Sequence, residues 1–243
     1  MNPILIALQF LTRLPVKPSS YQDLDLKSSL YWYGLAGFII GAILYGFFVA
    51  CTLLLPNLSH SVLAVLLLGI WVLITGALHL DGLADSADAW LGGLTKEKAL
   101  TIMKDPRSGP AGVVATLLLL LFKFACLESI LATNPAALIL VPALARGFMP
   151  LLFLHTPYAR GEGLGQHFSD GLSGSMVAVQ LSLITLVGFL ITGWATVIVL
   201  LVMGLVYLWL RRLMLQRIEG TTGDTAGAMI EILEAVALLA FIA

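Results

Sequence analysis

The chain of 243 residues is too apolar for an ordinary soluble protein. Hydrophobic residues make up 59% of it and charged residues only 11%, whereas a soluble domain carries roughly 25% charged residues. The net charge of −1 gives no indication of a nucleic-acid partner, which would require clustered basic residues. The composition therefore predicts an integral membrane protein in contact with the lipid bilayer.

Apolar stretches long enough to cross a bilayer as a helix, about 20 residues each, recur along the whole chain. We expect an all-α polytopic integral membrane protein with about seven transmembrane helices (six to eight) in one domain, residues 1–243. The expected spans are about 35–55, 62–80, 110–131, 136–155, 176–192, 194–210 and 226–243. Only three residues separate the fifth and sixth, so one long tilted helix is the alternative there.

The basic residues are distributed asymmetrically around these spans. If the amino terminus is cytoplasmic, the three outer connections carry no charge, and the inner segments carry eleven of the thirteen Lys and Arg: Arg13, Lys17, Lys27, Lys96, Lys98, Lys104, Arg107, Arg160, Arg211, Arg212 and Arg217. Such an excess on one side is the positive-inside pattern. The polar clusters lie on the same inner side, which favours an enzyme of the cytoplasmic face over a transporter.

Two further features set expectations for the chain ends and the cysteines. Residues 3–12 are apolar, but basic residues follow rather than precede them, so they do not resemble a cleavable signal. An interfacial helix or a half-inserted hairpin is expected instead. Cys51 and Cys126 lie inside predicted spans and are expected to be core residues, not a disulfide.

An acidic triplet is the first cluster with chemical meaning. Asp81, Asp85 and Asp88 are spaced i, i+4, i+7 after a predicted span, so they lie within about 60° of one another on a helix. Like charges on one face repel, whereas a divalent cation would be held there by carboxylate oxygens. The alternative is a solvated helix end. His79 is about 200° from Asp81 and is either structural or a substrate contact.

A second acidic pair begins the last predicted span. Asp224 and Glu231 are seven residues apart, hence about 20° apart on a helix, and are further metal-ligand candidates. Thr222 or Asp224 also suits the helix N-cap. Glu231 lies inside the membrane, where an acid requires a partner or a metal.

A basic turn precedes the third predicted span. Lys104, Asp105 and Arg107 are followed by Pro110, which suits the first turn of a helix. Free backbone N–H groups at a helix start, with basic side chains beside them, favour a phosphate-binding site. A basic membrane anchor is the alternative.

Remaining candidates are weaker. Arg146 lies within the fourth span and needs an anionic partner, either a substrate phosphate or an acid of the chain. Arg160, Gly161 and Gly163 form a glycine-rich segment that is a possible substrate loop. For Lys123 and Glu128 in the third span, the sequence predicts no specific function.

Together, the acids and the basic turn indicate a Mg²⁺-dependent transfer, with Mn²⁺ as a possible substitute, from a diphosphate donor. Asp85 or Asp88 would accept the proton of an attacking hydroxyl. The sequence offers no Ser–His or Cys–His set for covalent catalysis.

Three strings make the chain resemble a known family. They are His79-Leu-Asp-Gly-Leu-Ala-Asp-Ser-Ala-Asp-Ala-Trp, Met103-Lys-Asp-Pro-Arg-Ser-Gly-Pro-Ala-Gly and Thr222-Gly-Asp-Thr-Ala-Gly-Ala, preceded by Gln9-Phe-Leu-Thr-Arg-Leu-Pro. They are similar to cobalamin synthase, also called adenosylcobinamide-GDP ribazoletransferase. The strings occur in family order across the whole chain.

The resemblance implies an enzyme of the prokaryotic cytoplasmic (inner) membrane that acts at the end of vitamin B12 assembly. A hydroxyl of α-ribazole, or of its 5′-phosphate, would attack adenosylcobinamide-GDP, and GMP would leave. Asp81, Asp85 and Asp88 would hold Mg²⁺, Lys104 and Arg107 would grip the diphosphate, and Asp224 with Glu231 would complete the site. A homo-oligomer remains open.

Two other classes of function are weighed beside this one. A prenyltransferase or a CDP-alcohol phosphotransferase would also use aspartate-rich helices, Mg²⁺ and a diphosphate. A cation-coupled transporter would instead use the intramembrane charges Lys123, Glu128, Arg146 and Glu231 as its path.

Overall fold

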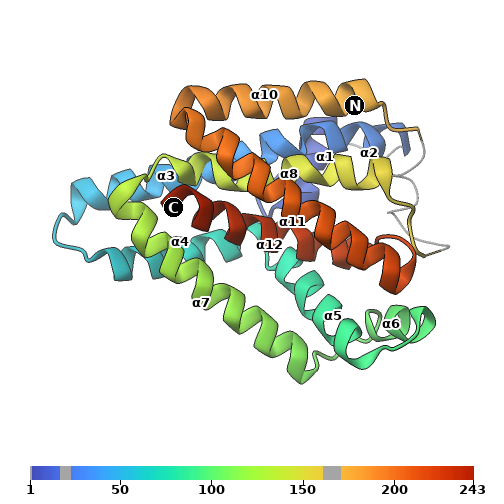
Figure 1. Cartoon of the computed structure of the whole chain (residues 1–243). Coiled ribbons are helices and arrows are strands. Elements are labelled where there is room, and N and C mark those ends of the chain that lie inside the picture. Colours follow the sequence, from blue (N-terminus) through green and yellow to red (C-terminus); the bar gives the residue numbers. More distant parts are fainter. Residues whose placement is uncertain (1, 17–22, 161–170) are drawn as a thin grey trace.

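The computed structural model describes residues 2–16, 23–160 and 171–243, and the regular elements in these ranges are helices (Figure 1). Their bounds are α1 (Pro3–Leu11), α2 (Asp23–Ser29), η1 (Leu30–Trp32), α3 (Tyr33–Leu54), α4 (His60–Thr75), α5 (Leu78–Gly92), α6 (Lys96–Ile102), α7 (Pro110–Thr133), α8 (Ala137–His155), α10 (Gly174–Thr192), α11 (Trp194–Ile218) and α12 (Gly223–Ile242).

Six helices within the described ranges are long and apolar enough to cross a bilayer, and the number is seven if the bent pair of α4 and α5 is one span. The all-α polytopic architecture with about seven spans is therefore confirmed. The doubtful pair at 176–210 consists of two helices, because Gly193 separates α10 from α11 with a positive φ of 62°. Such a backbone conformation suits glycine.

The second span differs from the prediction. It was expected to run unbroken to residue 80, with the acids at its end, but α4 ends at Thr75 and α5 leaves at an angle of 88°. Gly76 and Ala77 both have positive φ, and their N–H groups donate to the carbonyls of Leu73 and Val72. This pattern is a Schellman motif, which ends a helix. The acids consequently belong to α5, a separate helix with its own direction.

Helices α8 and α12 form the centre of the bundle. In their most apolar windows 83% and 72% of residues are buried, against 22–28% in the other long helices. Helix α12 packs against α5, α7, α8 and α11, while α3 and α10 pack against α8, as Figure 1 shows. A Cβ on Gly37 of α3 would lie 2.5 Å from the Cα of Ala143 in α8. Small residues thus let the backbones approach closely, as in other membrane bundles.

The remaining helices present apolar side chains outward. Large exposed hydrophobic residues are frequent on α7, α10 and α11, among them Leu117, Leu190 and Leu201. In a membrane protein such faces lie against lipid. Cys51 and Cys126 are buried and free, which confirms that they form no disulfide.

Candidate functional site

The acidic helix α5 packs closely against the start of α12. A Cβ on Gly82 would lie 2.6 Å from the carbonyl oxygen of Asp224, so the two backbones touch there. One turn earlier, a Cβ on Gly227 would lie 3.3 Å from the Cα of His79. Glycines at these two positions therefore bring the acids of α5 next to Asp224, as the sequence predicts.

Asp85 is the centre of the resulting acid cluster, defined here as Asp81, Asp85, Asp88 and Asp224. The other three carboxylates lie close enough to repel its charge, and Arg160 is the cation that opposes them. Asp81 is exposed and Asp85 is partly buried. Since four acids face one guanidinium among the residues that the structure describes, this part of the chain has a local excess of negative charge.

Asp224 is available for chemistry because another residue caps its helix. Thr222 is the N-cap of α12 and accepts from the backbone N–H of Thr225, whose hydroxyl in turn accepts from the N–H of Thr222. The structure thus resolves the choice between Thr222 and Asp224 as cap. The carboxylate of Asp224 instead accepts from the guanidinium of Arg160 at 2.7 Å.

Asp88 connects α5 to the start of α7. Its carboxylate accepts from the backbone N–H of Gly109 at 2.6 Å and of Gly112 at 2.9 Å. A Cβ on Gly112 would lie 2.6 Å from the same carboxylate. The helix start that the sequence predicted as a free phosphate-binding site is therefore occupied by Asp88, a stabilising arrangement for an anion at a helix N-terminus.

The basic turn before α7 lies beside this contact. Arg107 is 87% exposed at its side chain and donates to both oxygens of Asp105, at 2.9 and 2.7 Å. These hydrogen bonds lower the pKa of Asp105 to about 2. Lys104 is exposed. Asp88 thus anchors a turn whose cations remain accessible to an anionic substrate.

Glu231 and Arg146 do not join the acid cluster, and for both the structure favours the alternative of a partner within the chain over a metal or a substrate phosphate. Lys123 donates to Glu231 at 2.5 Å and to Glu234 at 2.6 Å, and Arg146 donates to Glu234 at 2.6 Å. All four side chains are at most 5% exposed. Buried charges need partners, and here each partner is another residue of the chain.

This buried network also gives Lys123 a role that sequence reasoning missed. The intramembrane cations Lys123 and Arg146 were a usable signal, because each requires an anionic partner. Their pairing was hidden, since Lys123 and Glu231 are 108 positions apart. Glu128 lies elsewhere and accepts from the hydroxyl of Ser61.

His79 lies on the side of α5 away from the acids, as expected from its spacing. It is 2% exposed, and neither ring nitrogen has a hydrogen-bond partner in the part of the chain that the structure describes. It interacts with the charges of Arg146, Glu234 and Lys123. His79 therefore borders the buried network. Gly161 and Gly163 of the possible substrate loop lie outside the described residues.

The acid cluster fits a metal only in part. Across the described ranges, no three side chains of His, Cys, Asp or Glu converge as a ready-made metal site. Carboxylate oxygens with unbalanced charge nevertheless are the donors that Mg²⁺ takes, usually with waters and substrate phosphates completing its coordination. The chain supplies hard oxygen ligands, and a diphosphate would supply the remainder.

Fold and site together define a polytopic α-helical membrane protein with an acidic, oxygen-rich site between two helices. The model of the cobalamin-5-phosphate synthase family matches residues 3–242. The chain belongs to this family. Among similar proteins, the adenosylcobinamide-GDP ribazoletransferase of Stutzerimonas stutzeri is 47% identical over 98% of this chain and 97% of its own length.

Other relatives of the same name give the same result. The Pseudomonas paraeruginosa protein is 48% identical over 99% of this chain and 97% of its own length, and the Pseudomonas fluorescens (strain Pf0-1) protein is 48% identical over 96% of each. No solved structure matches the chain.

Proposed function

We propose that this enzyme joins adenosylcobinamide-GDP and α-ribazole, or its 5′-phosphate, at the cytoplasmic face of a prokaryotic inner membrane, with Mg²⁺ as cofactor. Family membership assigns the chain to this transferase reaction of late cobalamin synthesis. A ribazole hydroxyl attacks the phosphorus attached to the corrinoid arm. GMP leaves, and adenosylcobalamin or its 5′-phosphate forms.

The observation that supports a metal is the excess of carboxylates around Asp85. Asp81, Asp85 and Asp224 are the residues that would hold Mg²⁺. When bound, this ion would neutralise charge that develops on the diphosphate during transfer.

The chain's own residues account for positioning and for proton transfer. Asp88 is engaged by two backbone N–H groups, so it holds the basic turn in place. Asp85 accepts no hydrogen bond in the described structure, and three other carboxylates lie around it. Asp85 is therefore the better candidate for the general base, and Lys104 with Arg107 for contacts to the donor phosphates.

The alternative functions are less well supported. A transporter would need accessible intramembrane charges, whereas Lys123, Arg146 and Glu231 are closed into a buried network. A prenyltransferase or CDP-alcohol phosphotransferase would share the acidic helix, but the family match spans nearly the whole chain.

The direct test uses purified protein in lipid nanodiscs with adenosylcobinamide-GDP, α-ribazole 5′-phosphate and Mg²⁺. GMP release and a cobalamin product are expected, both abolished by a chelator and restored by excess Mg²⁺. Turnover that persists unchanged in chelator would contradict the metal. If neither α-ribazole nor its 5′-phosphate gave a product, the proposed transferase reaction would be contradicted.

A further inference from the structure

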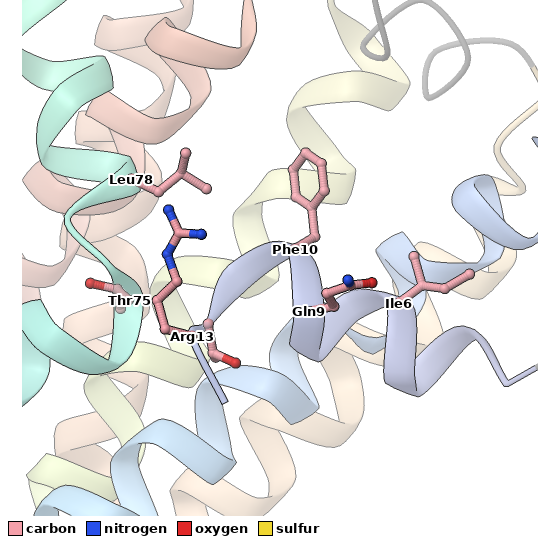
Figure 2. Close-up of a pocket in the computed structure, with 7 residues that line it drawn as sticks. Ile6, Gln9, Phe10, Arg13, Thr75 and Leu78 are labelled. Atoms are coloured by element: carbon pink, nitrogen blue, oxygen red, sulfur yellow. The ribbon is translucent and has the colours of Figure 1, made fainter. Parts of the chain in front are cut away.

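A pocket of about 240 Å³ lies between α1 and the break that separates α4 from α5. Its lining combines apolar side chains with one cation: Ile6, Gln9, Phe10, Thr12, Arg13, Thr75 and Leu78. Figure 2 shows Arg13 extending from the segment after α1 toward Thr75 and Leu78. The guanidinium group therefore reaches the point where the acidic helix begins.

Arg13 is positioned by the helix break itself. Its backbone N–H donates to the carbonyl oxygen of Ile74 at 2.7 Å. A Cβ on Gly76 would lie 2.6 Å from Cγ of Arg13 and 2.9 Å from Cδ, so a larger residue at this position would displace the arginine side chain. The same glycine has the positive φ that ends α4. Gly76 thus both ends α4 and leaves space for the side chain of Arg13.

The charge of Arg13 is not matched by an acid. Arg107, Arg146 and Arg160 each have a carboxylate within 4.0 Å, but no carboxylate of the described residues lies that close to Arg13. The hydroxyls of Thr12 and Thr75 donate to carbonyls of their own helices. A guanidinium whose donors meet no acceptor among the described residues, in a pocket with aromatic and aliphatic walls, suits a phosphate ester that carries an apolar group.

The pocket also lies close to the proposed chemistry. Leu78 lines it, and Asp81 follows three residues later on the same helix, a rise of about 4.5 Å. A phosphate bound at Arg13 would therefore lie near the start of the helix that carries the acid cluster.

We propose that Arg13 in this pocket binds the 5′-phosphate of α-ribazole 5′-phosphate. The inference rests on the proposed function and adds the residue that contacts the second substrate. The shared chemistry is a phosphate group, which a lipid headgroup or free phosphate would also present. The experiment must separate these sources.

The experiment compares Arg13→Gln and Arg13→Lys with the unchanged protein in nanodiscs of phosphatidylcholine, at saturating adenosylcobinamide-GDP and Mg²⁺. KM and kcat are measured separately for α-ribazole 5′-phosphate and for α-ribazole. Arg13→Gln is expected to raise KM for the phosphorylated acceptor about tenfold or more, since a charge-assisted hydrogen bond is lost. KM for α-ribazole should not change, and Arg13→Lys should lie between.

Arg212→Gln is the matched control, because it removes the same charge from an exposed position on α11 outside this pocket. It should alter neither KM. Inorganic phosphate should compete with α-ribazole 5′-phosphate in the unchanged protein and less in Arg13→Gln. Replacing part of the phosphatidylcholine with phosphatidylglycerol should leave the preference for the phosphorylated acceptor unaltered.

Three results would overturn the inference while leaving the transferase function intact. They are equal KM changes for both acceptors, an unchanged KM for α-ribazole 5′-phosphate in Arg13→Gln, and a preference that follows lipid composition rather than the acceptor phosphate. Absence of GMP release from the unchanged protein with both acceptors would instead refute the proposed function.

Discussion

The two charged regions of this protein differ in how their charges are balanced. In the buried network, Lys123 and Arg146 face Glu231 and Glu234, and the sum is zero. In the acid cluster, four carboxylates face Arg160 as the one cation among the described residues. A closed set of ion pairs needs no ligand, whereas an excess of like charge is costly without one. The net charge of each region thus distinguishes residues that stabilise the bundle from residues that are candidates for binding a cation.

The largest expected effect follows from breaking the balanced region. Glu234→Ala would leave Arg146 without a carboxylate partner and Lys123 with only one, inside the bundle. Removing one partner of a buried ion pair costs about 3–5 kcal/mol, so the purified protein should melt far below the unchanged one in detergent. Glu219→Ala is the control, since it breaks an exposed pair with Lys96 and should have no measurable effect.

A double variant sharpens this test. Lys123→Met should be strongly destabilising, whereas Lys123→Met with Glu231→Gln leaves Arg146 and Glu234 as a matched pair. The second change should restore part of the lost stability. If the double variant melts lower than either single variant, charge balance is not what stabilises this region.

Removing an acid from the cluster should have the opposite signature. Asp85→Asn should lower kcat for GMP release about 10²- to 10⁴-fold, the usual contribution of a general base. Its melting temperature should be equal or higher, because repulsion from Asp81, Asp88 and Asp224 is relieved.

Glu97→Gln, an exposed acid on α6, serves as control for Asp85→Asn and should retain activity. A normal kcat in Asp85→Asn would remove this residue from the mechanism.

Asp88→Asn should affect both stability and activity, unlike the variants of either region above. An amide oxygen still accepts one hydrogen bond, but the NH₂ group cannot accept from the second backbone N–H at the start of α7. We expect a loss of about 1.5–3 kcal/mol in stability, together with loss of GMP release. Activity lost at full stability would mean that Asp88 contacts metal or substrate rather than anchoring the basic turn.

The smallest effect is expected at the exposed turn. Arg107→Ala should raise KM for adenosylcobinamide-GDP a few-fold with kcat unchanged, because a solvated cation contributes little. An unchanged KM would exclude Arg107 from the donor site. The neighbouring Lys104→Ala should then be measured for comparison.

Much of this architecture was predictable from the sequence. Long apolar segments predicted seven spans, and helical spacing placed Asp81, Asp85 and Asp88 on one face. The break after Thr75 was not predicted, because a single glycine in an apolar stretch does not reveal that the next residue, Ala77, also takes a positive φ.

The choice between the alternatives at Glu231 and Arg146 could not be made from the sequence, for a different physical reason. Ion pairs between helices depend on tertiary packing, and the partners Lys123 and Glu234 lie on α7 and α12, far apart along the chain. Similarly, the sequence alone predicts a free anion-binding site at the start of α7. Only the fold shows that Asp88 accepts a hydrogen bond from that helix start. Local spacing predicts which residues share a face, but not what the opposite helix presents to them.

The central claim is that the unbalanced acids bind a divalent cation. Mn²⁺ binding to the purified protein, followed by electron paramagnetic resonance, tests this without turnover. We predict saturable binding that Mg²⁺ displaces, lost in Asp85→Asn and retained in Glu97→Gln. Binding unaffected by Asp85→Asn, or absent from the unchanged protein even with donor substrate present, would contradict the account.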